Sequence, residues 1–223
     1  MPAARPRRTQ TERSATTRAK LLDAALDCLV ERGYGGTTTT GVADRAGVSR
    51  GAQLHHFPTR AALVAAAVEH LYARLTAEYQ AGFAALPPRA ERLRAAIELL
   101  WSMFTVRHFP AVLELYTAAR TDAELRAQLE PIAARHQANV TRLAYAYFPA
   151  AARRRGRFDA ALTLILDAME GMASTRAIHR EQPSEARRLA TLHAVAAQAL
   201  DATNWDIPPG PALPHRGTRK ARG

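Results

Sequence analysis

Polar side chains that could read the edges of nucleic-acid bases gather in one short segment of the chain. Arg50 and Gln53 lie three residues apart, and a histidine pair, His55 and His56, follows them. An arginine side chain can pair bidentately with guanine, and a glutamine side chain can do the same with adenine. Adjacent residues on a helix diverge and a metal needs further ligands at a workable spacing, which argues against a metal site at the histidine pair. The segment therefore predicts base recognition.

The residues around this segment predict the short helices that would hold it. Thr38 and Ser49 can cap two successive helices, because threonine and serine favour that position. Gly47 suits the left-handed conformation that ends the first helix, Phe57 closes the second, and Thr59 can cap a third. A short helix, a glycine turn and a polar second helix are typical of a helix-turn-helix that reads double-stranded DNA.

An ordered set of short pieces lies between about residues 17 and 64, roughly a quarter of the chain. In order they are Glu31-Arg32-Gly33-Tyr34, Thr37-Thr38, Val42-Ala43, Ala46-Gly47-Val48-Ser49, Gly51, His55-His56-Phe57, Thr59-Arg60 and Leu63. At these spacings they resemble the N-terminal domain of tetracycline-repressor (TetR) type transcriptional regulators. The resemblance implies a homodimeric repressor that a small-molecule effector releases from a palindromic operator.

Two residues of the predicted recognition helix depart from the pattern of these regulators. Leu54 stands where members usually carry a tyrosine that contacts a DNA phosphate, and Gln53 precedes it where an apolar residue is common. The usual phosphate contact therefore lacks its usual side chain. Leu54 and Phe57, three residues apart, are expected to face the core, which leaves Arg50, Gln53 and one of the two histidines for DNA.

The expected DNA-contacting residues lie in the recognition helix or at the starts of helices. Hydroxyls, backbone N–H groups and charge at helix starts suit phosphates. Small residues allow the backbone to approach DNA closely, and an alanine can contact a thymine methyl group. The full set is Thr37, Thr38, Ser49, Arg50, Gly51, Ala52, Gln53, His55, His56, Thr59 and Arg60.

Composition favours an all-α fold with a basic, DNA-binding end. Of the 223 residues, 48% are hydrophobic and 6% are aromatic, while alanine, leucine and arginine dominate, which favours helices over sheets. Residues 1–60 carry ten Arg or Lys against five Asp or Glu, residues 61–206 carry 17 against 15, and residues 207–223 carry four against none. A basic end on a nearly neutral body is the charge distribution expected of a DNA-binding protein.

Cysteine content and hydropathy predict a cytoplasmic location. The single cysteine, Cys28, excludes an intramolecular disulfide and fits a reducing cytosol. It belongs to an apolar helix face, which predicts a packed rather than a reactive thiol. No apolar run approaches the roughly 20 residues of a membrane span, and the arginine-rich N-terminus does not have the pattern of a secretory signal.

Helical periodicity and breaks at proline and glycine divide the chain into four segments. We expect a disordered basic arm at residues 1–14 and a helix-turn-helix DNA-binding domain at residues 15–62. A helical domain for ligand binding and dimerisation should follow at residues 63–206, with a disordered basic tail at residues 207–223. Helices are expected to begin near residues 16, 38, 49, 60, 90, 110, 122, 158 and 184.

Two sets of body residues are candidates for ligand binding and for dimerisation. The family resemblance implies an effector pocket, although each candidate, taken singly, is more simply explained as core. The pocket candidates are Trp101, Phe104, His108, Tyr116, Arg120, His136, Asn139, Met169, Met172 and Arg176, of which either arginine at 120 or 176 could hold an acidic ligand. The first of the last two helices is apolar on two sides and its neighbour carries a similar apolar stripe, so this pair is the best candidate for a dimer interface. The family resemblance implies that the two helices of each subunit build a four-helix interface. Its candidates are Leu164, Ala168, Gly171, Leu192, Val195 and Ala196.

Two other classes of function remain open to the sequence. A ligand-independent architectural or partner-binding DNA protein would carry the same helix-turn-helix on a solid body, and a cavity-free interior would favour it. An enzyme would need a phosphate loop, an HExxH motif, a nucleophile elbow or an acid–base pair, and we find none. We therefore expect a ligand-responsive DNA-binding repressor without catalytic residues, metal or cofactor. Activation is the alternative sign, because the sign depends on where the operator lies.

Overall fold

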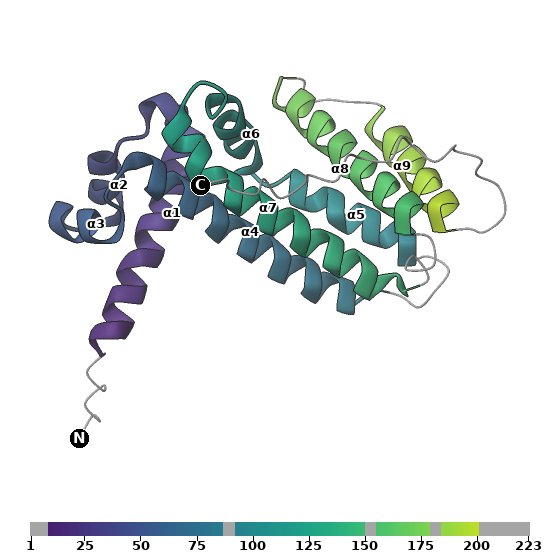
Figure 1. The fold of residues 1–223 in the computed structure, drawn as a ribbon, viewed down its shortest axis with the longest axis horizontal. Helices are drawn as coiled ribbons and strands as arrows, with labels where there is room; N and C mark the ends of the chain where they lie inside the picture. Colours follow the sequence, from purple (N-terminus) through teal and green to yellow (C-terminus); the bar gives the residue numbers. More distant parts are fainter. Residues whose placement is uncertain (1–8, 87–91, 150–154, 179–183, 201–223) are drawn as a thin grey trace, which may run out of the picture.

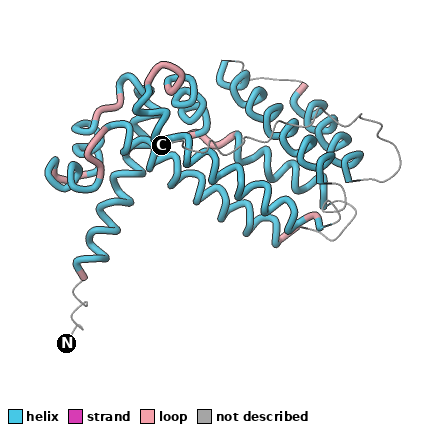
Figure 2. The backbone as a smooth tube through the Cα atoms, in the orientation of Figure 1, coloured by secondary structure: helices cyan, strands magenta, loops and turns pink. Residues whose placement is uncertain are grey.

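The part of the chain that the structure describes is built from helices joined by short turns (Figures 1 and 2). This computed structural model describes residues 9–86, 92–149, 155–178 and 184–200. Its helices are α1 (Gln10–Gly36), α2 (Thr39–Ala46), α3 (Arg50–His56), α4 (Arg60–Ala84), α5 (Arg92–Phe104), α6 (Phe109–Ala118), α7 (Ala123–Tyr147), α8 (Arg155–Ile178) and α9 (Glu185–Leu200). The predicted all-α fold is confirmed, and these described residues form no strand. None of the described helices is both long and apolar enough to cross a lipid bilayer.

The helix starts that surround the turn between α2 and α3 follow the predicted capping residues. The side-chain oxygens of Thr38, Ser49 and Thr59 each accept a hydrogen bond from the backbone N–H three residues later, which caps α2, α3 and α4. Gly47 ends α2 in the left-handed region at φ 62°, a conformation that costs glycine little. The predicted helix-turn-helix is therefore set by these local signals.

Helix α1 begins at Gln10, earlier than the start predicted near residue 16. Thr9 and Glu12 form a capping box in which each side chain accepts a hydrogen bond from the other's backbone N–H, at 3.2 and 2.8 Å. The expectation of a disordered arm is therefore wrong for residues 9–14. The first turns of α1 project away from the rest of the molecule (Figure 1). The remaining arm, residues 1–8, and the tail, residues 207–223, lie outside the described residues.

Helices α4 and α7 form the long axis of the molecule (Figure 1). Both begin beside the head, as we call α1–α3, and at their far ends the ring of Phe83 stacks on that of Tyr147 with 3.7 Å between centroids. Helix α5 packs along α4. The α8–α9 pair packs on α5 at the end away from the head, which leaves the outer faces of α8 and α9 free of other described helices (Figure 1).

Two hydrophobic cores hold these helices together. The larger core runs from the head into the body, with Cys28, Leu63 and Leu125 buried in it on α1, α4 and α7. The second core joins α5, α8 and α9 around Trp101 and Met169. Burying one large apolar side chain contributes about 1.5–3 kcal/mol. Because α4 residues between Ala61 and Leu75 belong to the larger core together with residues of α1 and α7, head and body share one packed interior. The domain boundary predicted after residue 62 therefore falls within α4.

Candidate nucleic-acid interface and ligand cavity

The recognition helix α3 turns one side to solvent and packs the other into the head. Four residues of α3 are exposed, and together we call them the reading face: Arg50, Gly51, Leu54 and His55. Phe57, directly after the helix, is buried in the larger core. An exposed arginine one turn before an exposed leucine gives this face one charged hydrogen-bond donor and one apolar surface.

Gln53 does not belong to the reading face, and Leu54 does. The Gln53 side chain is 0% exposed, and its amide nitrogen donates a 2.7 Å hydrogen bond to the carbonyl oxygen of Phe57. Leu54 is 47% exposed. The structure thus reverses the orientation that we expected for these two neighbours. The cause is helix geometry, because residues four apart share a side more closely than residues three apart, and Phe57 is the buried anchor.

The helix starts around α3 present several of the predicted phosphate-contacting groups. Thr38, Ser49 and Thr59 are exposed at the N-termini of α2, α3 and α4, where backbone N–H groups point outward. Ala52 and His56 are half-buried at the edge of the reading face. Burial lowers the pKa of His56, and the positive charges of neighbouring groups lower it further. In the free protein, the shift favours the neutral form of this histidine.

Two other predicted phosphate contacts are engaged within the head. Thr37 is buried, and its hydroxyl donates to the carbonyl oxygen of Gly33 at 2.7 Å. The guanidinium of Arg60 lies over the ring of Tyr34, 4.0 Å from its centroid, and donates to the Tyr34 carbonyl oxygen at 3.3 Å. Both side chains hold the end of α1 against the start of the next helices, which is a structural task.

A small polar joint connects the head to α6 and α7. The carboxylate of Glu114 accepts a 2.6 Å hydrogen bond from the backbone N–H of Tyr34, and the Tyr34 hydroxyl donates to Asp122 at 2.7 Å. Hydrogen bonds from the Leu125 backbone and from Tyr34 lower the pKa of Asp122, which also caps α7. The preceding Gly33 has φ 66° and ψ −179°, a region that is essentially restricted to glycine. The joint therefore fixes the end of α1 to the body.

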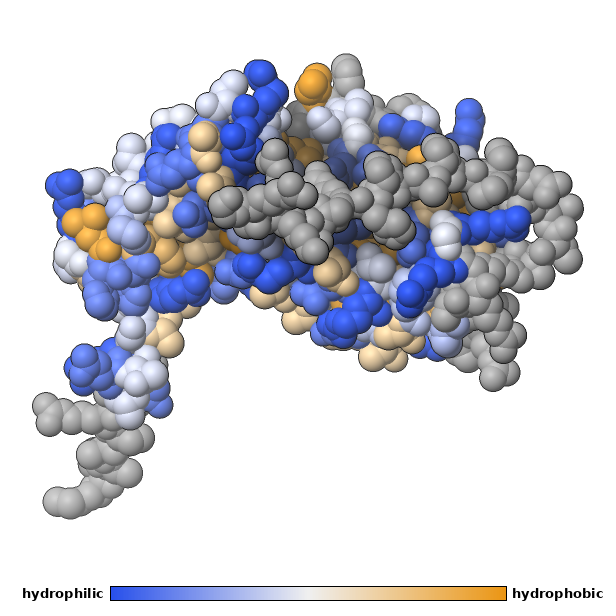
Figure 3. Space-filling view, in the orientation of Figure 1, coloured by the Kyte–Doolittle hydropathy of each residue, from blue (hydrophilic) through white to orange (hydrophobic). Residues whose placement is uncertain are grey.

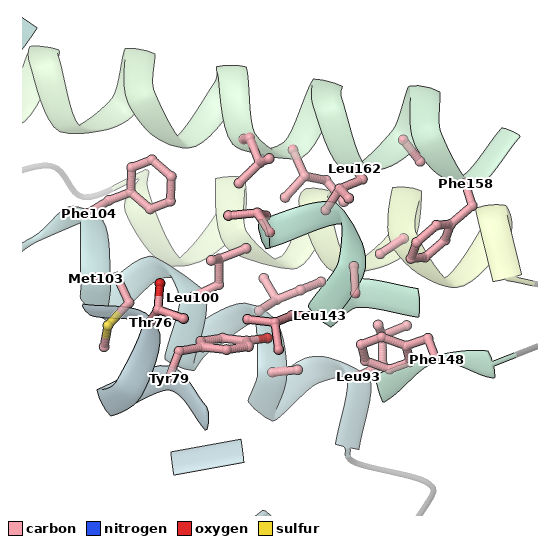
Figure 4. Close-up of a pocket in the computed structure, with 18 of the residues that line it drawn as sticks. Thr76, Tyr79, Leu93, Leu100, Met103, Phe104, Leu143, Phe148, Phe158 and Leu162 are labelled. Carbon is pink, nitrogen blue, oxygen red and sulfur yellow. The ribbon is translucent and has the colours of Figure 1, made fainter. Parts of the chain in front are cut away.

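The body contains a cavity of about 130 Å³ between α4, α5, α7, α8 and α9 (Figure 4). Apolar side chains from all five helices line it, among them Leu93, Leu100, Leu143, Phe158 and Leu162. Among the described residues that line it, none carries an ionisable acid, lysine or arginine side chain. Its walls favour an apolar, uncharged occupant, since burying an unpaired charge is costly.

Besides Tyr72, whose hydroxyl is hydrogen-bonded to Tyr116, three residues with polar groups interrupt the apolar lining of this cavity. Thr76 and Tyr79 come from α4, and His136 comes from α7. In Figure 4 the Tyr79 ring reaches toward Leu143 with its hydroxyl end foremost. Burial raises the pKa of Tyr79 and lowers the pKa of His136 to about 4, so both groups are neutral at pH 7. They can offer hydrogen bonds to an occupant without adding charge.

A second, more polar pocket lies on the other side of one cavity wall. Tyr72, Thr76 and His136 line both spaces, and the ring of Tyr72 stacks on that of His136 at 3.7 Å. Beyond this wall, Arg135 forms an ion pair with Glu69 at 2.6 Å between α7 and α4. The wall is therefore a stacked pair of rings between an apolar interior and a polar vestibule.

The same wall leads to the joint with the head. The hydroxyl of Tyr72 is hydrogen-bonded to the hydroxyl of Tyr116 on α6. Glu114, which holds the backbone of Tyr34, lies two residues earlier on that helix. A continuous set of contacts thus connects His136 at the cavity with the end of α1 in the head.

The structure distributes the ten predicted pocket residues over several places. Phe104 and His136 line the cavity, Asn139 lines the outer pocket, and Tyr116 lies directly behind the wall. Most of the cavity lining was not predicted, including three residues with polar groups on α4. Tyr72, Thr76 and Tyr79 lie at positions i, i+4 and i+7, a helical spacing that could have revealed them.

The other six predicted pocket residues lie away from the cavity, and all of them except Arg120 contact other helices. Trp101, Met169 and Met172 are buried in the second core, where the Trp101 indole N–H donates to Glu185 at 3.0 Å. Arg176 pairs with that same carboxylate at 3.0 Å. His108 lies 3.7 Å from Asp27 of α1, and Arg120 is exposed at the turn after α6. Except for Arg120, these side chains connect helices to one another.

The outer faces of α8 and α9 carry small and apolar residues. Leu164 is 53% exposed, Gly171 is exposed, and Ala168 and Val195 are half-buried. The last two dimer candidates, Leu192 and Ala196, are buried in the subunit's own second core. The apolar surface available to a partner is therefore centred on α8.

Comparisons with known proteins agree with this reading of the fold. Residues 21–67 match the sequence profile of "Bacterial regulatory proteins, tetR family". The HTH-type transcriptional regulator CymR of Pseudomonas putida is 35% identical over 167 residues, which cover 75% of this chain and 82% of CymR. A match of 167 residues extends well beyond the head.

Solved structures share the whole arrangement of helices. The fatty acid degradation regulator FadR from Bacillus halodurans superposes with a TM-score of 0.58 at 15% identity, covering 87% of this chain and 97% of FadR. The multidrug binding protein EbrR, complexed with ethidium, superposes with a TM-score of 0.62 at 20% identity, covering 83% of this chain and 99% of EbrR. At such identities the likeness concerns the fold alone. The relationship to CymR decides the family: the chain belongs to the tetR family of bacterial transcriptional regulators, and α2 and α3 are its DNA-binding helix-turn-helix.

Proposed function

We propose that this regulator is a repressor that binds a near-palindromic operator as a homodimer and is released when a small molecule occupies its body. The observation that carries the proposal is the apolar cavity of about 130 Å³, whose wall is connected to the head. A ligand-independent DNA protein would have no use for such a cavity, since unfilled core volume lowers stability.

The cavity favours a small, uncharged and mainly apolar effector. An apolar cavity of about 150 Å³ in another protein stays dry and accepts benzene. One six-membered ring with a short substituent therefore matches the volume here. Thr76, Tyr79 and His136 can meet a single hydroxyl or carbonyl group on such a ring. The complex of EbrR with ethidium supports a ligand-binding role for proteins of this fold.

Release requires that the effector binds preferentially to a conformation of the protein that has low affinity for DNA. An occupant that displaces the stacked rings of Tyr72 and His136 also displaces Tyr116 on α6. Glu114, on the same helix, then carries the movement to Tyr34 and the end of α1. The two heads of a dimer would leave the spacing of about 34–36 Å that matches successive major grooves.

The test combines operator selection with effector titration. Full-length protein should select an inverted repeat from random duplex DNA and bind it with a sub-micromolar dissociation constant that weakens steeply as salt increases. Benzyl alcohol is the neutral probe, and benzoate and benzylamine are its charged counterparts. We expect the neutral compound to release the operator at lower concentrations than the charged ones.

A filled cavity provides the matched control. Ala144→Phe places a ring in the cavity, whereas Ala138→Phe adds the same ring on the exposed side of α7. The first variant should bind operator and ignore benzyl alcohol, and the second should respond like wild type. Sequence-independent binding, or an equal response of both variants, would contradict the proposal. Operator binding that no probe affects would favour the ligand-independent DNA protein instead.

A further inference from the structure

Leu54 is a large apolar side chain on a surface that otherwise suits DNA. It is one of three large hydrophobic residues that are exposed in the described part of the chain, with Leu164 and Ile178. The other two lie on α8, outside the head. In the space-filling view, strongly hydrophobic atoms form small isolated patches, one of them at the end occupied by α2 and α3 (Figure 3). Leu54 is therefore the apolar feature of the reading face.

The orientation of Leu54 is fixed by its neighbours. Phe57 is buried, and the Gln53 amide group is both buried and hydrogen-bonded to the Phe57 carbonyl oxygen. These two anchors set the rotation of a helix that is seven residues long. Leu54 therefore stays beside Arg50, one turn away on the reading face, and cannot turn inward without expelling Gln53.

A leucine can do little with the DNA backbone. It has no donor for a phosphate oxygen and no charge, so it cannot hold the head in register on the backbone. In the major groove, the C5 methyl group of thymine is the apolar feature that distinguishes one base from the others. Contact between two methyl-bearing groups removes both from water and needs no hydrogen bond.

We infer that Leu54 packs against a thymine methyl group in the major groove and thereby selects thymine at one position of each operator half-site. The inference rests on the proposed operator binding. Arg50, one turn earlier on the same face, then reads a neighbouring base pair through hydrogen bonds. Direct reading at this helix thus combines one apolar and one polar contact.

Deoxyuridine isolates the contact, because it differs from thymidine in that methyl group alone. Each thymine of the selected operator is replaced singly by uracil, and binding is measured for wild type, Leu54→Ala and Arg50→Ala. At one position per half-site, wild type should bind about fourfold more weakly, the effect of about one buried methylene group. Leu54→Ala should lose nothing at that position, whereas Arg50→Ala should keep the fourfold loss there.

Three outcomes would overturn the inference. Wild type could bind every uracil-substituted operator as tightly as the parent, or Leu54→Ala could keep the full loss, which would assign the methyl contact to another residue. Failure to select any operator sequence would remove the proposed function and the inference with it, and is distinguishable from the first two results. Because Leu54 is exposed, Leu54→Ala should unfold at the wild-type temperature, which excludes misfolding as a cause.

Discussion

The side chain of Gln53 has a polar atom that its surroundings do not satisfy. Its amide nitrogen donates to the Phe57 carbonyl oxygen, but its Oε1 atom is buried without a hydrogen-bond partner. Such an atom costs about 1–3 kcal/mol relative to its solvated state. Gln53 therefore holds α3 in place through one strong contact and weakens the head through the other atom of the same amide.

Gln53 and Arg50 should respond in opposite ways to truncation. Gln53→Ala removes a buried hydrogen bond and leaves a void, so we expect a loss of about 1–3 kcal/mol in the free energy of unfolding. Below its unfolding temperature, Gln53→Ala should have the same preference among operator bases as wild type. Arg50→Ala, at an exposed position, should keep its stability and lose preference at one base pair. Urea denaturation and operator selection measure both properties, and an altered base preference of Gln53→Ala would contradict this assignment.

His136 should make the body sensitive to acid. Burial lowers the pKa of this histidine from 6.5 to about 4, so the unfolded chain binds more protons between these values. The free energy of unfolding is therefore unaffected by this group above pH 6.5. It falls as the pH drops from 6.5 toward 4, because the unfolded chain is protonated first. Between pH 7 and pH 5, the free energy of unfolding of wild type should fall by about 1–2 kcal/mol more than that of His136→Phe. Urea denaturation at both pH values is the measurement, and equal pH dependence of the two proteins would contradict the expectation.

At the scale of elements, α6 is the part that both the cavity wall and the head contact. If Glu114 transmits the movement of α6, Glu114→Ala should bind operator as wild type does. It should need at least about fivefold more effector for release, because coupling free energies are commonly about 1–3 kcal/mol. Glu130→Ala removes another exposed carboxylate, on α7, and serves as the control. Release curves followed by fluorescence anisotropy compare the three proteins. Equal curves for all three would remove Glu114 from the route.

Gly33 and Glu114 should be coupled in stability as well. A Cβ atom on Gly33 would lie 2.7 Å from the Glu114 Oε1 atom, and its φ and ψ values are strained for any residue with a Cβ. Gly33→Ala should therefore cost about 1–3 kcal/mol or more. The same substitution in a Glu114→Ala background should cost less, because the clash is gone and only the backbone strain remains. Thermal unfolding of the four proteins gives the coupling, and strictly additive losses would contradict the contact.

Most helix boundaries follow from short-range signals that the sequence displays. Thr38, Ser49 and Thr59 predicted three caps that the structure contains, because a hydroxyl three residues before a free N–H acts locally. The start of α1 was missed although Thr9 and Glu12 have the capping-box spacing, because the basic composition around them was interpreted as disorder. At these helix starts, the capping residues predict the structure better than the composition of the surrounding segment does.

The candidate site was less predictable, because orientation depends on packing between distant segments. Both Gln53 and Leu54 lie at helical spacing from Phe57, and hydropathy favoured burial of the leucine, whereas the head buries the glutamine. The cavity raises the same problem, since Tyr72 and Thr76 on α4 meet His136 on α7 only after the two helices pack. Sequence periodicity identifies a face of a helix, and the neighbours decide what that face contacts.

At the scale of the whole molecule, the exposed apolar surface of α8 should determine assembly. Leu164→Glu places a charge where Leu164 is 53% exposed, and we expect the proposed dimer to dissociate at micromolar concentrations. Ala138→Glu adds the same charge on the exposed side of α7 and should leave the dimer intact. Sedimentation equilibrium measures both masses. A wild-type protein that sediments as a monomer, or a Leu164→Glu variant that remains dimeric, would contradict this location of the interface.

The reactivity of Cys28 can measure how often the head opens. It is the single thiol, and it is buried between helices of the head, in the core that continues into the body. A colourless aromatic disulfide reagent that turns yellow on thiol exchange can reach it after the head has opened, so its rate of colour change reports how often that opening occurs. Bound operator should slow the thiol reaction, because it holds the head closed. The measurement needs no dye or tag on the protein.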